Sequence, residues 1–265
     1  MYCSNSANAN RDELPSHLKS TPKKSRLGML WKISGGILVF FVMLALLFPW
    51  ITNRLITANN RAVGAKGRDI VVAIKGANKS RATQGLPPIW PKTYLPYTNR
   101  LDDISGKIFQ TSSDYFYELY DGKNVGSDQQ HPYIKGFNYG KLAGGGVPTK
   151  SGQGNLVAAN NMWIIAANIT DEDDDRIPLL ITRNVDAKEI EKVVNQGLKV
   201  NEFEKRLAFS KTYLAPFGNK QIVVVYKSGK FRIANSNGRT LGVFFNNKEL
   251  PPRDPSKQPI VYLMP

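Results

Sequence analysis

The sharpest charged cluster in the sequence is the acidic run of residues 171–175, Asp-Glu-Asp-Asp-Asp. Calcium in proteins is bound by several carboxylate oxygens at once, and the alternation of Asp171, Asp173 and Asp175 is similar to the start of an EF-hand loop. That loop needs a glycine where Arg176 stands and a glutamate where Thr182 stands. The mismatch favours a solvated acidic turn between two strands, with a calcium site at the three aspartates as the alternative.

Residue types suited to enzymatic chemistry are scarce. The chain has one cysteine, Cys3, and two histidines, His17 and His131. Nucleophilic catalysis needs a base oriented beside a serine or cysteine, and His131 stands in a predicted loop without a motif around it. The glycine clusters lack the Lys-Ser/Thr pair that follows in a phosphate-binding P-loop. We therefore predict that the protein is not an enzyme and has no cofactor, the calcium alternative apart.

The basic balance of the chain bears on its partners. Its formal net charge is +15 and its pI is near 9.8. Beyond residue 32 the chain holds 30 Lys and Arg against 19 Asp and Glu, so most of the excess lies there. Grooves that bind nucleic acid gather such charges among aromatic residues on one face. The scattered charges of this sequence predict a solvated basic surface and no nucleic-acid partner.

A charge-free apolar stretch runs from Ile33 to Ile51. Nineteen helical residues at about 1.5 Å each nearly cross a hydrocarbon layer of about 30 Å. Trp31 and Trp50 flank the stretch, as aromatic residues do at membrane interfaces. The small-residue site that would end a cleaved signal peptide is poorly matched at residues 56–58. The sequence predicts a retained transmembrane helix over 28–51, with the lipid bilayer as a partner.

The charges that flank this helix predict its orientation. Five basic residues precede it and four follow closely, and the preceding ones lie nearer together. The positive-inside rule then favours a cytoplasmic N-terminus. Residues 1–27, rich in Ser, Asn, Lys and Pro, are predicted to form a disordered basic cytoplasmic tail.

The helical pattern continues beyond Pro49. Apolar residues recur at helical spacing and predict one buried face, at Ile56, Val63, Ile70, Ile74 and Ala77. Basic residues keep a heptad register on a flanking face, at Arg54, Arg61, Arg68 and Lys75. We predict an amphipathic helix extension over 52–80, with a separate short helix after a linker as the alternative.

The order of these features resembles the N-terminal helix of type IV pilins and type II secretion pseudopilins. Leu46-Leu47-Phe48-Pro49, followed by Asn53-Arg54 and Asn60-Arg61-Ala62, is similar to their helix around and after its proline. Residues 70–77 and then Gly85-Leu86-Pro87-Pro88 are similar to the helix end and exit of large pseudopilin-like families of Verrucomicrobia and Lentisphaerae. The first 80 residues carry most of the resemblance.

The resemblance implies a pilin-like fold and a structural or assembly subunit of a type II secretion or type IV pilus-like system. Its expected site is the bacterial inner membrane, crossed once, with the following domain in the periplasm. Expected partners are other pseudopilins or envelope proteins, in a homo- or hetero-oligomer formed through the N-terminal helix. Gly35 and Gly36 would allow close helix approach there, and Pro49 belongs to the same packing segment.

One departure from the family pattern opens a second hypothesis. Prepilins are cleaved after a glycine and carry a glutamate at the fifth mature position. Gly28-Met29 is the best candidate for the cleavage site, but Ile33 stands at the fifth position, and the apolar segment contains no glutamate. The alternative is a non-assembling single-pass envelope protein whose exported domain binds a partner or ligand.

Residues 81–265 are predicted to form one exported α+β domain with long loops. One helical pattern occupies residues 101–120. A second begins at Asp186-Ala187-Lys188-Glu189, which has capping-box form, and stops at Gly197, and a short helix is predicted around 202–209. Strand patterns occupy 162–167, 179–182, 221–226, 231–234, 241–245 and 260–263. The hairpin joined by residues 227–230 indicates antiparallel pairing. The long N-terminal helix is expected to pack on a mainly antiparallel sheet.

Overall fold

The computed structural model describes residues 26–94, 103–121, 161–212, 217, 221–235 and 238–265, and only the backbone of residues 26–35, 49–50, 53, 55–57 and 120–121. The chain divides into two units, Met1–Arg54 and Leu55–Pro265. Helix α1 (Arg26–Thr83) has residues in both units.

In the first unit, the side chains of α1 from Ile37 to Phe48 are apolar and exposed. The large hydrophobic side chains from Ile37 to Phe48 are between 44% and 71% exposed. After them, the Thr52 hydroxyl donates a hydrogen bond to the Phe48 carbonyl at 3.0 Å. Among the described residues, no helix is both long and apolar enough to span a membrane.

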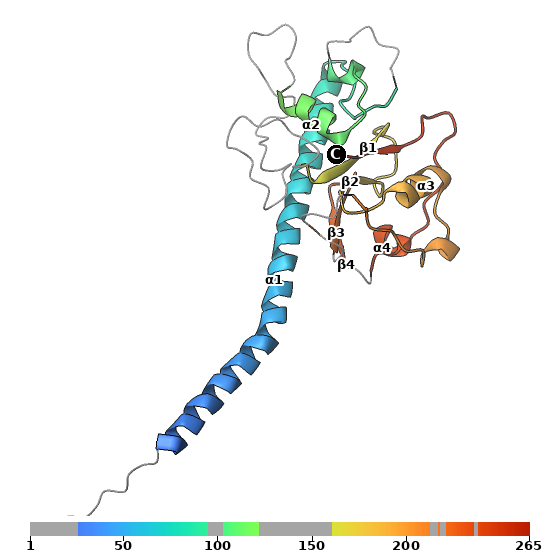
Figure 1. Ribbon diagram of the computed structural model, residues 1–265. Coiled ribbons are helices and arrows are strands. Elements are labelled where there is room, and N and C mark those ends of the chain that lie inside the picture. Colours follow the sequence, from blue (N-terminus) through green and yellow to red (C-terminus); the bar gives the residue numbers. More distant parts are fainter. Residues whose placement is uncertain (1–25, 95–102, 122–160, 213–216, 218–220, 236–237) are drawn as a thin grey trace, which may run out of the picture. The chain divides into compact units, whose positions relative to one another are not determined.

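The second unit is built on a five-stranded antiparallel sheet with the strand order β4-β3-β2-β1-β5. The strands are β1 (Trp163–Ala167), β2 (Pro178–Thr182), β3 (Gln221–Tyr226), β4 (Phe231–Asn235) and β5 (Val261–Leu263). Figure 1 shows the sheet with the helices around it. Because every pair of neighbouring strands is antiparallel, the unit is an α+β fold, as predicted.

The second-unit part of α1 lies on one face of this sheet. Val63, Ile70 and Ile74 are buried, as their helical spacing predicts, and Val71 is buried beside them. Two glycines bring the helix close to the strands. A Cβ on Gly64 would collide with Phe231, and one on Gly67 would collide with Trp163 and Val225. Arg61, Arg68 and Lys75, on the flanking face, are exposed.

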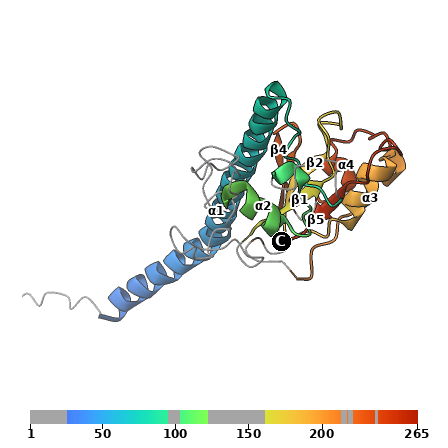
Figure 2. The same cartoon turned by 90° about the horizontal axis from the view of Figure 1, so that it is seen from above.

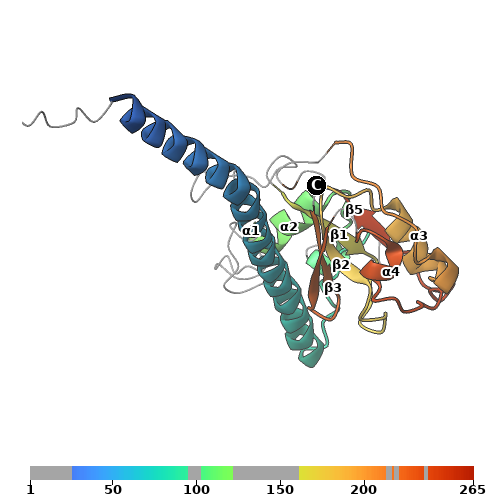
Figure 3. The same ribbon diagram turned by 90° about the horizontal axis from the view of Figure 1, so that it is seen from below.

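Helices α3 (Lys188–Gln196) and α4 (Leu241–Phe244) cover the opposite face of the sheet. Figures 2 and 3, seen from above and from below, both show the strands between α1 on one side and these two helices on the other. Every residue of β1 and β2 is buried, as is expected of strands covered on both faces.

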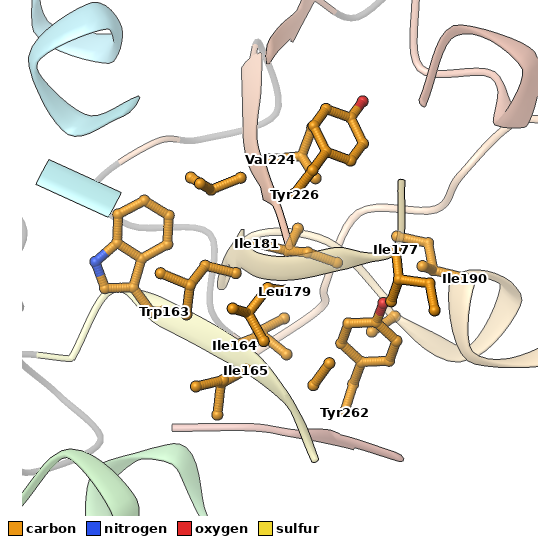
Figure 4. Close-up of a cluster of buried hydrophobic side chains, with 14 of the residues drawn as sticks. Trp163, Ile164, Ile165, Ile177, Leu179, Ile181, Ile190, Val224, Tyr226 and Tyr262 are labelled. Atoms are coloured by element: carbon orange, nitrogen blue, oxygen red, sulfur yellow. The ribbon is translucent and has the colours of Figure 1, made fainter. Parts of the chain in front are cut away.

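Paired apolar side chains form the centre of the core. Ile164, Ile181 and Val224 are in register on three adjacent strands. Figure 4 shows them with Ile190 of α3 and with Tyr262, whose hydroxyl donates to the Pro178 carbonyl at 2.7 Å. This cross-strand row ties the central strands together.

The predicted helix over 101–120 is shorter than the sequence pattern suggests. A 3-10 turn occupies Ile104–Gly106, and α2 covers only Ser112–Asp121. Thr111 ends the intervening extended segment, because its hydroxyl accepts a hydrogen bond from the Asp114 amide at 3.1 Å. This side-chain cap fixes the start of α2 at Ser112. Residues 101–102 lie outside the described residues.

Two further predictions were wrong. The predicted strand at 241–245 is the short helix α4, because the Thr240 hydroxyl accepts from the Val243 amide and caps a helical turn. The predicted helix around 202–209 is a 3-10 turn, Val200–Glu202, followed by extended chain. In that chain Arg206 and Phe209 form isolated bridges with Thr240 and Val185.

Candidate functional site

The acidic loop, residues 171–175, lies between β1 and β2, where the sequence predicts a turn. Asn168 opens the connection with a φ of 64°, a left-handed conformation that asparagine adopts more readily than most residues. Its side-chain amide accepts from the Thr93 amide at 2.9 Å and donates to the Pro259 carbonyl at 2.7 Å. The loop therefore starts from a backbone point held by two distant segments.

Asp173 is the most buried carboxylate of the acidic loop. Its Oδ2 lies 2.8 Å from Nη1 of Arg253, and both side chains are only 6% exposed. The same oxygen accepts from the Thr170 amide at 2.7 Å. A carboxylate taken out of water is tolerated when an opposite charge and a hydrogen bond compensate it. Asp173 is therefore satisfied by the protein itself.

Lys227, at the end of β3, brings a buried ammonium group under the acidic loop. Its Nζ donates to the main-chain carbonyls of Asp171 at 2.6 Å and Asp173 at 2.5 Å. Burial lowers the pKa of Lys227, and the carboxylates of Asp175, Asp173 and Asp171 oppose that change. These two hydrogen bonds hold the backbone of the loop at the end of β3.

Asp171 and Asp175 have separate partners. Oδ1 of Asp171 accepts a hydrogen bond from Nε1 of the buried Trp90 at 2.8 Å. Oδ1 of Asp175 lies 3.8 Å from Nζ of Lys75 on α1 and 3.9 Å from Nζ of Lys227. Both are long ionic contacts of a side chain that is 63% exposed.

The geometry decides what the acidic loop can do. Asp171, Asp173 and Asp175 face different basic or N–H partners, and in the described part of the chain no three His, Cys, Asp or Glu side chains are grouped to hold a metal ion. The contacts tie α1, the Trp90 segment, the end of β3 and residues 253–257 to one turn. We call the acidic loop together with its partners Trp90, Lys227 and Arg253 the electrostatic clasp. The calcium site stays a prediction from the sequence.

The other predicted site residues belong to the first unit, whereas the acidic loop belongs to the second. Gly28, Met29, Gly35 and Gly36 belong to the first-unit part of α1. A Cβ on Gly36 would meet nothing within 4 Å. Pro49 is described by its backbone only, and His131 lies outside the described residues.

The sequence did not reveal the basic half of the clasp. An acidic run predicts that cationic side chains lie nearby in the fold to compensate its charge. Lys227 and Arg253, however, follow Asp173 by 54 and 80 residues, so the sequence does not show that they fill this role. Nothing in their local sequence marks them, since Lys227 reads as a turn residue and Arg253 as part of a proline-rich segment.

Comparisons with known proteins identify no relative. The chain matches no family model, and it has no significant match among curated proteins or solved structures.

Proposed function

We propose that the chain is a membrane-anchored, pseudopilin-like structural or assembly subunit of a type II secretion or type IV pilus-like system, displayed on the periplasmic side of the bacterial inner membrane. The observation that carries the proposal is the order of two features in α1. A charge-free apolar stretch, residues 33–51, comes first, and a stretch with one face buried on a sheet follows it.

The exposed apolar side chains support a lipid environment for the first feature. An aqueous surface rarely carries a contiguous row such as Ile37–Phe48, and such rows mark sites covered by membrane or protein. The row includes every helical direction rather than one stripe, which favours lipid on all sides over a single protein partner.

The second feature, the face of α1 that is buried on the sheet, indicates that the helix is part of the folded unit. Val63, Ile70 and Ile74 give their apolar surface to the sheet, and Gly64 and Gly67 allow the close approach. We further propose that the protein is not an enzyme, since neither the motifs nor the acidic loop supply a nucleophile with its base.

A second candidate function rests on the missing glutamate. Residues 33–51 contain no acidic side chain, so the charge that guides prepilin assembly in the resembling families has no counterpart. That observation favours a non-assembling single-pass envelope protein that binds a partner or ligand through its exported unit.

Topology can be tested with the single native cysteine. A membrane-impermeant maleimide should label Cys3 only after the inner membrane is permeabilised. In a Cys3→Ser background, Ser228→Cys places a thiol on the exposed hairpin turn and should be labelled in spheroplasts without permeabilisation. Labelling of Cys3 in intact spheroplasts would contradict the orientation.

Membrane anchoring is tested by placing charged residues in the apolar stretch of α1. Val42→Arg with Leu46→Arg should release the protein from alkaline-washed membranes, because each arginine costs about 2.5–3.5 kcal/mol at a helix centre. The matched control is Val42→Leu with Leu46→Ile. A wild-type protein that is already soluble in the wash refutes the anchor.

Assembly is tested by processing. The mass of the mature protein shows whether the chain starts at Met29, as cleavage after Gly28 requires. Incorporation into a filament by the wild type supports the assembling subunit. Incorporation only by Ile33→Glu identifies the wild type as the non-assembling protein.

A further inference from the structure

The two edge strands of the sheet, β5 and β4, differ in whether their outward backbone groups are hydrogen-bonded. Along β5, four outward backbone groups are hydrogen-bonded by side chains of α3 or by the first residue of α2. Asn195 accepts from the Ile260 amide at 2.8 Å and donates to the Ile260 carbonyl at 2.8 Å. Glu191 accepts from the Tyr262 amide at 3.0 Å, and the Ser112 amide donates to the Met264 carbonyl at 2.7 Å. Helices α2 and α3 thus close this edge.

On β4, the opposite edge is open. The Tyr226 amide donates to the Lys230 carbonyl, which fixes the hydrogen-bonding parity of the β3–β4 pair. Since antiparallel pairs alternate, Arg232 and Ala234 bond to β3, and the backbone groups of Phe231 and Ile233 point away from it. Within the described residues, the amides and carbonyls of Phe231 and Ile233 have no hydrogen-bond partner.

The side chains along β4 indicate what kind of strand would fit. Phe231 and Ile233 are half-buried and share the face toward α1, where Phe231 lies against Gly64. Arg232 is half-buried on the other face, with its guanidinium donating to the Val243 carbonyl. Lys230 is exposed at the start of the strand. A neighbouring strand would place apolar side chains beside Phe231 and Ile233 and acidic ones beside Arg232.

Charge strengthens the choice of an acidic partner. Between Glu204 and Glu249 the sequence contains nine Lys and Arg and no Asp or Glu. Of these, Lys230 and Arg232 lie at β4, whereas Lys227 bonds to the acidic loop and Lys205 pairs with Glu189. A second copy would bring the same basic edge. The one dense acidic run of the chain, residues 171–175, is already held by Trp90, Lys227 and Arg253. Another protein is therefore the source that fits best.

We infer that the open edge of β4 is a docking site for an extended acidic segment of a partner protein, which adds a sixth strand to the sheet. Main-chain hydrogen bonds to Phe231 and Ile233 supply the affinity, and the alternation of apolar and acidic side chains supplies the selectivity. The inference concerns the second unit alone and does not depend on the membrane anchor.

The experiment measures binding of the full-length protein in detergent to a fluorescent peptide of alternating valine and glutamate. The peptide is expected to bind, and a matched valine–lysine peptide is expected to bind at least about tenfold more weakly. Ile233→Pro removes one outward donor at a position where an edge strand tolerates proline, and it should weaken binding about tenfold or more. Ile233→Ala keeps the donor and is the control.

A second measurement leaves the protein unchanged. Two versions of the valine–glutamate peptide carry N-methyl groups on alternate amides, one on each set. Only the set that faces β4 should abolish binding, because the strand bonds through every second residue. Loss of binding with Ile233→Pro together with this parity effect supports strand addition.

Three results overturn the inference: no binding of either peptide, equal binding by both N-methylated peptides, or a single-stranded oligonucleotide that binds more tightly than the acidic peptide and displaces it. In the first case Lys230 and Arg232 serve to keep the edge unpaired, which is a common use of charge on edge strands. In the last case the basic edge is a nucleic-acid surface.

Discussion

At the residue scale, the stability of the clasp depends on charges that are withdrawn from water. Asp173 and Arg253 are each 6% exposed, whereas Glu172, which pairs with Lys257 at 2.9 Å, is 79% exposed. Removing one partner of a buried pair leaves an uncompensated charge, but removing a surface partner leaves a hydrated one.

We predict that Arg253→Met lowers the free energy of unfolding by about 3–5 kcal/mol. Glu172→Gln is the control and should change it by less than about 1 kcal/mol. Urea denaturation followed by tryptophan fluorescence measures both. Equal small effects would show that Asp173 is hydrated in solution.

The Asp174–Arg176 pair predicts a pH dependence. Hydrogen bonds from Arg176 hold the pKa of the Asp174 carboxyl below its ordinary value, against the opposing effect of partial burial. A folded-state pKa below the unfolded value of about 3.9 stabilises the native state above that pH and loses this effect as the pH falls through the folded-state pKa.

Asp174→Asn should therefore be less stable than the wild type at neutral pH, and the difference should shrink below about pH 4. Urea midpoints at a series of pH values measure it. The same substitution in an Arg176→Met background should show a smaller pH-dependent difference. A difference that stays constant down to acidic pH contradicts the role of the pair.

At the element scale, α1 provides a matched pair of glycines. A Cβ on Gly67 would stand 2.7 Å from side-chain atoms of Trp163 and Val225, whereas one on Gly76 would meet nothing within 4 Å. Alanine improves intrinsic helix propensity at both positions by about 1 kcal/mol, so the two substitutions differ only in packing.

We predict that Gly67→Ala destabilises the second unit by about 1–3 kcal/mol through overpacking. Gly76→Ala should stabilise it by up to about 1 kcal/mol. Thermal unfolding of the two variants beside the wild type measures the contrast. Stabilisation by both would mean that α1 is not held against the sheet in solution.

The sequence predicted elements correctly where the hydrophobic periodicity and the flanking turn residues indicate the same element. The β3–β4 hairpin, β1, β2, β5 and α3 all lie where apolar runs end at turn residues. The cap of α3 differs from its expected form, since the Asp186 carboxylate accepts from the Lys188 amide but Ala187 is the capping residue. Gly197 ends the helix with a φ of 87°, as predicted.

The failures arose where tertiary contacts decide. A five-residue apolar run such as 241–245 has too few residues to show its period. It forms a helical turn because Leu241 donates to the Lys205 carbonyl and because Asn246 and Asn247 adopt positive φ after it. For the acidic loop, the sequence located the carboxylates, but their cations arrive from elements that only the fold brings near.

At the scale of the whole molecule, the clasp predicts indifference to calcium. The carboxylates of Asp171, Asp173 and Asp175 already have protein partners, so an ion would have to displace them. We expect millimolar CaCl2 or a chelator to leave the Tm unchanged. A site filled at a hundred times its Kd would instead add about 2.7 kcal/mol of stability, visible as a rise in Tm, and would restore the calcium hypothesis.

The packing of α1 also means that the helix is synthesised well before some of the strands that it packs against. Asn60 bonds to Gln221, which is made 161 residues later, and Gly64 lies against Phe231. At about 5–20 residues per second, the ribosome needs roughly ten to thirty seconds to cover that span. Late in this interval β1 and β2 are made, but β3 and β4 are not, so the stripe of Val63, Ile70 and Ile74 on the nascent helix is at most partly covered. Slow translation between residues 83 and 221 would prolong this interval and leave the unfinished chain exposed to chaperones and proteases for longer.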